Sequence, residues 1–191
     1  MGRHGRRLIR DRLIGTTAEH VIRKGDVPVL VVSLPPTQPY RRPVITTDLE
    51  DASRRTFELA FRVLGPEVTQ VNVTHAFNVP FEVFGPPTSA ARETSDYQRS
   101  FQETAITSLA KFLTPYQDSG VCWQTIIRQG DPRAVVLEAA LRYQADLIAV
   151  GTHGRSGIAH ALVGSVAEWV IAAATCDVLV ARPIRFSFEL S

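Results

Sequence analysis

The stretch that decides the fold is residues 145–165, ADLIAVGTHGRSGIAHALVGS. Its first six residues form a largely apolar run without alternation, which is typical of a strand covered on both faces of a parallel sheet. Gly151 and Gly154 follow this run directly. After nine further residues come Gly164 and Ser165, which open a predicted helix over residues 165–174. The order of strand, glycine loop and helix predicts one unit of an α/β fold.

The spacing G-x2-G-x9-G-S in this stretch points to a phosphate site. Glycine lets backbone N–H groups approach an anion closely, and a helix N-terminus adds free donors and a favourable dipole. Ser165 would supply a hydroxyl donor and Arg155 a positive charge. The spacing differs from two common phosphate loops, G-x-x-x-x-G-K-[ST] and G-x-G-x-x-G. A glycine-rich loop that only turns the chain is the alternative.

Strands and helices alternate throughout the sequence before this stretch. A β-branched run at residues 43–47 precedes a helical pattern of apolar residues, which ends at Gly65-Pro66. Alternating strands and helices predict a parallel sheet with right-handed crossovers, so residues 43–191 indicate a doubly wound, open α/β domain. The predicted strands are residues 43–47, 68–76, 121–128, 145–150 and 178–181, and the later helices are residues 93–116, 134–143 and 165–174.

The chain also contains an internal repeat. Residues 2–33 align without a gap onto residues 151–182 at an offset of 149, with 14 identities in 32 positions. We therefore predict three parts: a C-terminal remnant of a first domain (residues 1–34), a proline-rich linker (residues 35–42) and a complete domain (residues 43–191). The identical residues of the first copy are Gly2, His4, Gly5, Arg6, Ile9, Leu13, Gly15, Ala18, Glu19, Val21, Ile22, Val29, Leu30 and Val31.

The glycine segment of residues 151–180 resembles the nucleotide-binding signature of the universal stress protein family. Residues 44–48 (VITTD) resemble the family's first strand with its terminal aspartate, and residues 72–76 (NVTHA) resemble the second strand with its histidine. Residues 130–132 (GDP) are similar to the family's Gly-x-Pro before the third helix. The N-terminal copy has the same glycine spacing, so the chain resembles a tandem member cut inside its first domain.

This resemblance implies a five-stranded parallel sheet of order 3-2-1-4-5, of the adenine nucleotide alpha hydrolase type. Asp48 and Gly151 would then face one crevice, where the strand order reverses. The implied ligand is an adenine nucleotide such as ATP, usually with Mg²⁺ or Mn²⁺ bound through the phosphates. Asp48 and Ala76 would contact adenosine, and the glycine segment would hold phosphate. The complete candidate set for nucleotide binding is Thr47, Asp48, Ala76, Gly151, His153, Gly154, Arg155, Gly164, Ser165 and Val166.

Some candidate residues have a plainer interpretation. Asp48 could cap the helix that follows it, because carboxylates are favoured at a helix N-terminus. His75 and His153 belong to no Ser/His/Asp or Cys/His set, so we interpret them as structural or solvated. No cluster has the spacing of metal ligands, so a metal would arrive with phosphates. We expect a nucleotide-binding regulator that is not an enzyme, or at most a slow ATPase.

The composition is that of an ordinary globular protein. The 191 residues are 45% hydrophobic and 21% charged, and the net charge of +2 is too small to indicate a nucleic-acid partner. The sequence lacks a membrane-spanning apolar run and a signal peptide, so we predict a cytoplasmic protein without membrane contact. The arginines at positions 3, 6, 7, 10 and 12 are interpreted as part of a solvated loop, with anion binding as the alternative. Cys122 and Cys176 are predicted to be buried free thiols rather than a disulfide.

The repeat brings two last-strand segments into one chain, residues 29–32 and 178–181. We expect them to pair antiparallel, which would cover an exposed edge. The predicted helix of residues 16–24 would keep an apolar stripe of Ala18, Val21 and Ile22 with no sheet beneath it, so we expect a homodimer or larger assembly. An interaction module that binds no nucleotide and dimerises through its last strands is the alternative function. Gly164→Val, which should block the approach of phosphate, would separate the two.

Overall fold

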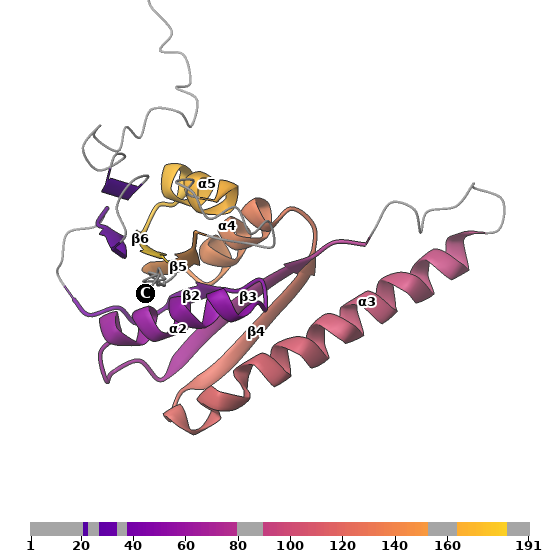
Figure 1. The fold of residues 1–191 in the computed structure, drawn as a ribbon, viewed down its shortest axis with the longest axis horizontal. Coiled ribbons are helices and arrows are strands. Elements are labelled where there is room, and N and C mark those ends of the chain that lie inside the picture. Colours follow the sequence, from indigo (N-terminus) through magenta and orange to yellow (C-terminus); the bar gives the residue numbers. More distant parts are fainter. Residues whose placement is uncertain (1–20, 23–26, 34–37, 80–89, 153–163, 183–191) are drawn as a thin grey trace, which may run out of the picture.

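A computed structural model describes residues 21–22, 27–33, 38–79, 90–152 and 164–182 (Figure 1). Within these residues, six strands form one sheet in the order β1-β6-β5-β2-β3-β4. The strands are β1 (Val29–Val31), β2 (Pro43–Thr46), β3 (Gln70–Phe77), β4 (Cys122–Gln129), β5 (Leu147–Gly151) and β6 (Asp177–Ala181). The helices are α2 (Asp51–Val63), α3 (Ala90–Leu113), the 3-10 helix η3 (Thr114–Ser119), α4 (Pro132–Arg142) and α5 (Ser165–Ala173).

The sheet is mixed, with five parallel strands and one antiparallel edge strand. β4, β3, β2, β5 and β6 lie parallel, which confirms the predicted doubly wound sheet of order 3-2-1-4-5. β1 pairs antiparallel with β6, as predicted for the two last-strand segments. Its register sets Val29 opposite Val180, Leu30 opposite Leu179 and Val31 opposite Val178.

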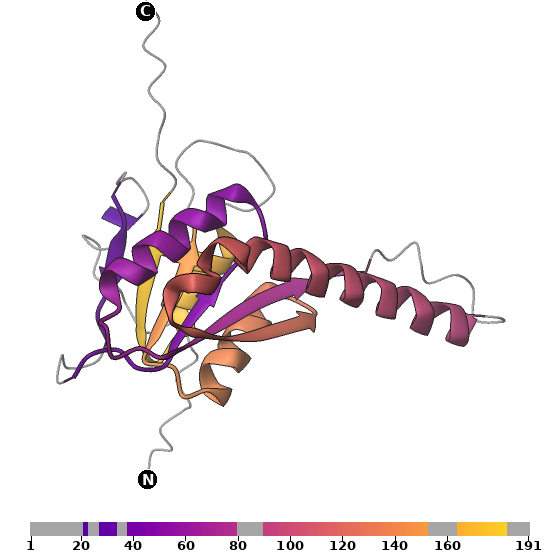
Figure 2. The same ribbon diagram turned by 90° about the horizontal axis from the view of Figure 1, so that it is seen from below.

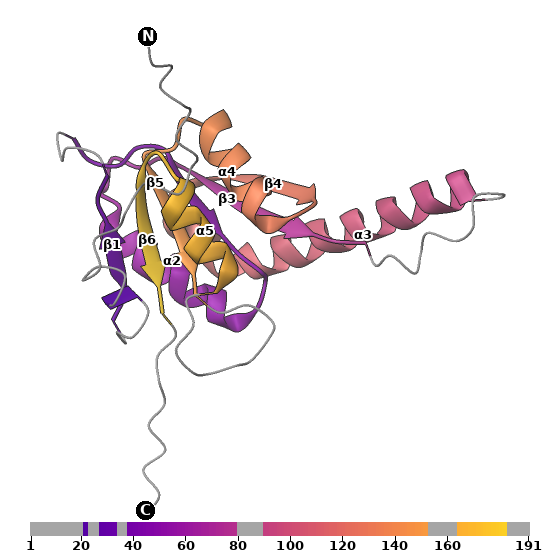
Figure 3. The ribbon, with the colours of Figure 1, turned by 90° about the horizontal axis from the view of Figure 1, so that it is seen from above.

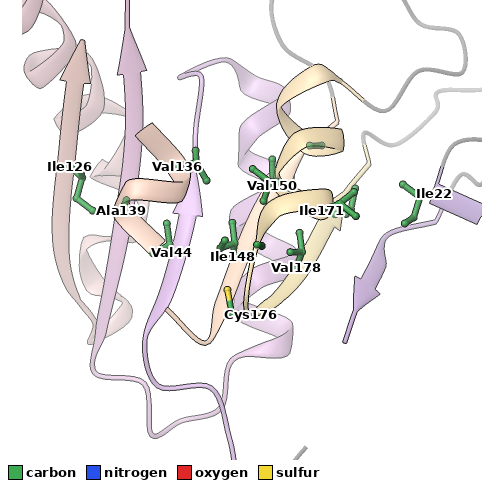
Figure 4. Close-up of a cluster of buried hydrophobic side chains, with 14 residues drawn as sticks. Ile22, Val44, Ile126, Val136, Ala139, Ile148, Val150, Ile171, Cys176 and Val178 are labelled. Atoms are coloured by element: carbon green, nitrogen blue, oxygen red, sulfur yellow. The ribbon is translucent and has the colours of Figure 1, made fainter. Parts of the chain in front are cut away.

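Helices cover both faces of the sheet (Figures 2 and 3). On one face, Phe57 of α2 and Leu109 of α3 pack in a buried cluster with Ile45 of β2. On the other face, Val136 of α4 packs in a second cluster with Val44 of β2 and residues of α5 (Figure 4). Successive strand residues point to opposite faces, so neighbouring positions of β2 supply both cores. The non-alternating apolar strands of the sequence reflect this double burial.

The long helix ends earlier than the apolar pattern predicts. The prediction was residues 93–116, whereas α3 ends at Leu113 and the chain continues as η3. Pro115 lies in the first turn of η3, and proline has no N–H with which to continue an α-helical hydrogen-bond ladder. The end of α3 carries Leu109 and Phe112 into the core, while its N-terminal half extends beyond the sheet (Figure 1).

The apolar stripe predicted for the N-terminal helix is partly covered, so that expectation is wrong for Ile22. Ile22 is 4% exposed and belongs to the cluster on the α4 and α5 face. Figure 4 shows its side chain pointing toward Ile171 of α5. Pairing of β1 with β6 holds this part of the chain at the edge of the sheet, where an apolar side chain can join the existing core. Val21 is exposed, and Ala18 lies outside the described residues.

The two cysteines differ in their surroundings. Cys176, just before β6, is a buried free thiol, as predicted. Cys122 is also free, but it is exposed, so its predicted burial is wrong. It is the first residue of β4, the edge strand opposite β1, and the sheet continues on only one side of it.

Two buried carboxylates anchor the segment that leads into β2. Asp146, just before β5, accepts hydrogen bonds from the backbone N–H groups of residues 41 and 42 at 2.8 and 2.9 Å. Asp177, at the start of β6, accepts from the Tyr40 hydroxyl at 2.5 Å and from the Ser33 N–H at 2.7 Å. These bonds tie the chain on both sides of residues 34–37 to the amino ends of β5 and β6.

Candidate functional site

A cleft of about 390 Å³ lies at the carboxyl ends of β2, β3 and β5. β2 and β5 are neighbours at the point where the strand order reverses, which is where open α/β sheets bind ligands. The starts of α4 and α5 flank the same cleft. The described lining is Thr46, Thr47, Asp48, Ser53, Thr74, Ala76, Pro132, Val136, Val150, Gly151, Thr152, Gly164, Ser165 and Val166.

The fold brings most of the candidate nucleotide-binding residues together at this cleft. Seven of them line it: Thr47, Asp48, Ala76, Gly151, Gly164, Ser165 and Val166. They come from three strand ends and one helix start that are far apart in the sequence. The other three candidates, His153, Gly154 and Arg155, lie outside the described residues. What each residue binds stays a prediction.

Asp48 follows β2 and presents one unpaired oxygen. Its Oδ1 accepts a hydrogen bond from the Ser53 hydroxyl at 2.5 Å and another from the Glu50 N–H at 3.1 Å. Its Oδ2 is buried and has no hydrogen-bond partner among the residues that the structure describes. A buried acceptor without a partner costs free energy, which a donor on a bound ligand would recover. Asp48 is thus a lining residue of the cleft whose second carboxylate oxygen lacks a donor in the described structure.

The proposed capping role of Asp48 is not what the structure shows. The N-cap residue of α2 is Glu50, and no side chain caps this helix. Asp48 instead closes a short turn through the Glu50 N–H and holds the Ser53 side chain. The turn needs Leu49 at a φ of 69°, a left-handed conformation that side chains seldom adopt. The helix therefore begins at Asp51, and Asp48 precedes it as a residue of the turn that lines the cleft.

Thr47 and His75 hold the turn that carries Asp48. The Thr47 hydroxyl accepts from the Leu49 N–H at 2.9 Å, and the Thr47 N–H donates to the Thr74 carbonyl at 3.0 Å. His75 is buried, and its Nδ1 lies 2.9 Å from the Thr47 carbonyl. Because a carbonyl only accepts, Nδ1 carries the proton and donates. This contact gives His75 the structural role expected from the sequence.

The start of α5 supplies backbone donors to the cleft. Gly164 is its N-cap residue and has no side chain with which to accept hydrogen bonds from the first backbone amides of the helix. Ser165 and Val166 are the first helical residues, and both line the cleft. The positive end of the helix dipole adds to their attraction for an anion. This corner can hold a phosphate group.

Gly164 is required by packing as well. A Cβ there would lie 2.6 Å from the backbone oxygen of Thr152, which already accepts the Gly164 N–H at 2.9 Å. Thr152 in turn donates its N–H to the Ala181 carbonyl. A side chain at position 164 would therefore displace the start of α5 from β5. Gly164→Val cannot separate phosphate contact from local structure, so the discriminating role expected of it is wrong.

Several lining residues were missed by the sequence analysis: Thr46, Ser53, Thr74, Pro132, Val136, Val150 and Thr152. Pro132 belongs to the Gly-x-Pro segment that carried part of the family resemblance. It is the first residue of α4 and forms part of the wall of the cleft. Thr46 and Thr74 are register partners near the ends of adjacent parallel strands. A rule that takes every polar residue within two positions of a parallel strand's carboxyl end would have found Thr46. It would not have separated Thr74 from an ordinary strand threonine.

The cleft carries little formal charge. Asp48 is the one charged side chain in its described lining. Within the described part of the chain, no group of three or more His, Cys, Asp and Glu residues could hold a metal ion. None of the described helices is both long and apolar enough to cross a membrane. Attraction for an anion therefore comes, in this part of the chain, from backbone amides.

Comparison with known proteins gives a consistent result. The profile of the universal stress protein family matches residues 1–33 and 39–182. A universal stress protein of Methanocaldococcus jannaschii is 32% identical over 144 residues, which cover 75% of this chain and 82% of that protein. Universal stress protein E of Escherichia coli is 29% identical over 166 residues, 85% of this chain but 48% of that protein, so the chain spans about half of that relative. The solved structure of universal stress protein UspA from Lactobacillus plantarum has the same fold, with a TM-score of 0.62 and 19% identity, over 76% of this chain and 100% of that one.

Proposed function

The chain belongs to the universal stress protein family, and we propose that its cleft binds an adenine nucleotide, with ATP as the first candidate, as a regulatory ligand in a stress response. The single observation that carries the proposal is the unpaired Oδ2 of Asp48 in a cleft that also contains the uncapped start of α5. Within the described residues, Asp48 Oδ2 lacks a hydrogen-bond donor, and the N-cap residue Gly164 offers no side-chain acceptor to the first amides of α5. A ligand with hydroxyl or amino donors at one end and an anion at the other complements both.

The phosphate end of the ligand belongs at α5. The backbone N–H groups of Ser165 and Val166 and the Ser165 hydroxyl are the donors on this side. The glycine loop before α5 would complete the cradle through Gly154 and Arg155, which lie outside the described residues. Phosphate is unfavourable beside Asp48, because two negative charges would meet.

The nucleoside end belongs at β2, β3 and α4. Ala76, Pro132 and Val136 give this side an apolar wall suited to a flat base. Asp48 Oδ2 would accept from a donor on the nucleoside, and a ribose hydroxyl bound by a carboxylate is the arrangement of many dinucleotide sites. Asp48 binds a hydrogen-bond donor and the start of α5 binds an anion, so the nucleotide lies with its nucleoside at Asp48 and its phosphates at α5.

The side chains of the cleft suit a protein that binds a nucleotide as a regulator better than an enzyme that hydrolyses it rapidly. Asp48 is the one ionisable side chain in its described lining, and its Oδ1 already accepts two hydrogen bonds. Its other oxygen, Oδ2, belongs in this proposal to the nucleoside end of the cleft, away from the phosphates at α5. No side chain of the described lining is then placed to activate water beside the phosphates, so we propose at most slow ATP hydrolysis. Mg²⁺ or Mn²⁺ would bind through the phosphates. We place the protein in the cytoplasm, where adenine nucleotides are present.

Calorimetric titration of Mg-ATP into the wild-type protein and Asp48→Asn tests this proposal. Asparagine keeps one oxygen for the Ser53 and Glu50 donors but replaces the unpaired oxygen by an amide donor. We expect saturable binding at about one site per chain in the wild type. Asp48→Asn should weaken it by about tenfold or more, as for loss of a hydrogen bond to a charged group.

The matched control is Asp51→Asn, which makes the same chemical change three residues later. The Asp51 side chain is almost fully exposed and pairs with Arg54 in the first turn of α2. It should leave the affinity unchanged. A folded wild-type protein that binds no adenine nucleotide in the presence of Mg²⁺ would refute the proposal.

A second candidate function, an interaction module, rests on the edge strand β1. β6 is flanked by β5 and β1, so the last strand of the domain offers no free edge for the dimer first expected through it. The outer edge of β1 is unpaired within the described residues. Exposed apolar residues gather in the same short segment: Val21, Val27, Leu30 and Val32. Such an edge favours association with another strand.

Sedimentation of the double variant Val27→Ser, Val32→Ser tests the interaction module. If association through β1 is the function, this variant should become smaller than the wild type at the same concentration. Leu141→Ser, which removes an exposed leucine from α4, serves as the control and should not change the size. A wild-type protein that is monomeric at all concentrations excludes this candidate and leaves nucleotide binding.

A further inference from the structure

The floor of the cleft contains a buried threonine whose hydroxyl has no partner. Thr74 lies in β3, is 1% exposed, and lines the cleft. Its Oγ1 makes no hydrogen bond within the described structure. A buried hydroxyl without a partner is unfavourable, and such groups in native proteins are few. Another strand former, such as valine, would fill the same space without this cost.

The position of Thr74 places this hydroxyl on the nucleoside side of the cleft. Thr74 is the register partner of Thr46 on β2, and the turn with Asp48 begins one residue after Thr46. Ala76, two residues further along β3, lies on the same face and also lines the cleft. The phosphate donors of α5 follow β5, on the other side of β2. Thr74 therefore lies on the β2–β3 side of the cleft, where Asp48 follows β2, rather than on the side of α5.

We infer that Thr74 is a specificity-determining residue, whose hydroxyl hydrogen-bonds a polar group of the bound nucleoside at the floor of the cleft. This inference rests on the proposed nucleotide-binding function and names a contact within it. A hydroxyl can donate and accept, so it accommodates either a base nitrogen or a sugar hydroxyl. It does not accommodate an apolar edge, which would leave Oγ1 unpaired in a dry site.

The alternative partner for Oγ1 is a water molecule that stays in the cleft. A retained water would satisfy the hydroxyl whether or not a nucleotide is bound. Removal of the hydroxyl would then release that water and leave the affinity unchanged. Direct contact with the ligand predicts a loss of affinity instead, so the two cases give opposite results.

The experiment is calorimetric titration of Mg-ATP into the wild-type protein, Thr74→Val and Thr74→Ser. Valine keeps the shape of threonine without the hydroxyl, and serine keeps the hydroxyl. We expect Thr74→Val to weaken binding by about fivefold, the loss expected for one neutral hydrogen bond, and Thr74→Ser to stay within about twofold of the wild type. Thermal unfolding of each ligand-free variant checks that the fold is retained.

Thr56→Val is the matched control. Thr56 is also 1% exposed and its Oγ1 also lacks a hydrogen-bond partner in the described structure. It lies on α2, outside the lining of the cleft, and touches that lining from behind, at Gly151 on the phosphate side. It should leave the affinity unchanged. An equal loss in Thr56→Val and Thr74→Val would show a general packing effect and would overturn the inference.

Titrations with 2′-deoxy-ATP and inosine triphosphate identify the group that Thr74 contacts. One of these two analogues should bind the wild type more weakly than ATP does but bind Thr74→Val as well as ATP does. The group that this analogue lacks is the partner of Thr74, because the analogue and the substitution then remove the same hydrogen bond. Wild-type binding with unchanged affinity in Thr74→Val overturns the inference and leaves the proposed function standing. Absence of wild-type binding overturns both.

Discussion

Leu30 lies opposite Leu179 in the ladder between β1 and β6, and the two residues are each other's counterparts in the internal repeat. The repeat has an offset of 149, which maps residue 30 onto residue 179. The flanking pairs cross over: Val29 is the counterpart of Val178 but lies opposite Val180. This is the pattern of a local twofold axis between two equivalent strands. Two copies of one segment therefore associate within a single chain as identical strands do in a symmetric dimer.

The β1–β6 ladder should depend on the inward-facing valines of β1. Val31 packs against the cluster on the α4 and α5 face, so Val31→Asp would bring a carboxylate against apolar side chains. We expect a loss of about 1–2 kcal/mol in the free energy of unfolding. Hydrogen exchange should show faster exchange of backbone amides in β6. The control, Val32→Asp, adds the same charge at an exposed position, and equal effects of the two variants would contradict this account.

Tyr40 should stabilise the fold through its bond to Asp177, and the effect should end at high pH. Burial raises the pKa of Tyr40, and the hydrogen bond to Asp177 and the negative charge of that carboxylate raise it further. Tyr40→Phe should lower the free energy of unfolding by about 1–2 kcal/mol at neutral pH. Its phenol stays neutral in the folded protein but ionises above about pH 10 in the unfolded chain. Stability should therefore fall above that pH, more steeply in the wild type than in Tyr40→Phe.

Chemical denaturation from neutral pH to above pH 10 measures both effects of Tyr40. Tyr97→Phe removes a hydroxyl from an exposed tyrosine on α3 and provides the control. It should leave both the stability and its pH dependence unchanged. A wild type and a Tyr40→Phe variant with parallel pH profiles would show that Tyr40 titrates normally in the folded protein.

Asp131 should stabilise the start of α4 and thus one wall of the cleft. It is the N-cap residue, and its side chain accepts from the Arg133 N–H at 2.9 Å. Hydrogen bonds from the Arg133 side chain and backbone lower the pKa of Asp131. Asp131→Ala should cost about 1 kcal/mol at neutral pH, as typical for an N-cap.

The stabilisation by Asp131 should depend on pH in the acid range. Because its pKa is lowered in the folded protein, the carboxylate contributes fully above the unfolded value of about 3.9 and loses its effect as the pH falls through the folded value. The difference between the wild type and Asp131→Ala should shrink over that interval in denaturation experiments. Glu138→Ala, on the exposed face of the same helix, is the control. A difference that persists in strong acid would assign the effect to something other than the carboxylate.

Replacing Gly164 by alanine, which has the smallest side chain, should already destabilise the protein. In Gly164→Ala the new Cβ would meet a backbone oxygen, so the start of α5 has to move. We expect a loss of about 1–3 kcal/mol in the free energy of unfolding. Gly65→Ala is the control, because there the nearest atom would be the movable end of the Glu67 side chain. Equal stability of the two variants in thermal unfolding would show that α5 can shift freely.

The order of elements could be predicted because it rests on local patterns. Residues 43–47 and 145–150 are apolar runs of strand length, and the glycines and prolines between the elements mark their ends. Element ends could not be predicted as closely: α3 ends at Leu113, because Pro115 stops the helix within an apolar pattern that continues. Periodicity reports which face of a helix is buried, but it does not report where the backbone ladder breaks.

The site could be predicted as far as its motifs extend. Asp48, Gly151 and Gly164 were identified from spacing and resemblance, and all three line the cleft. Thr74 was not identified, since threonine is an ordinary strand former. Thr74 became a candidate because its hydroxyl has no hydrogen-bond partner in the described structure. Whether a hydroxyl has a partner depends on the side chains that the neighbouring strands and α4 bring next to it.

The sequence by itself determined the α/β class, the strand order through its family motifs, and the repeat that makes Leu30 and Leu179 equivalent. Those features follow from the spacing of residues and from apolar runs, which can be recognised in the sequence without knowledge of tertiary contacts. Only the tertiary structure decided that Asp48 keeps a buried, unpaired oxygen beside the cleft, that Gly164 is held against Thr152, and that Ile22 joins the core. The physical reason is that hydrogen-bond satisfaction and close packing depend on how the folded chain places atoms beside one another, over 12 residues for Thr152 and Gly164 and over 149 for Ile22 and Ile171.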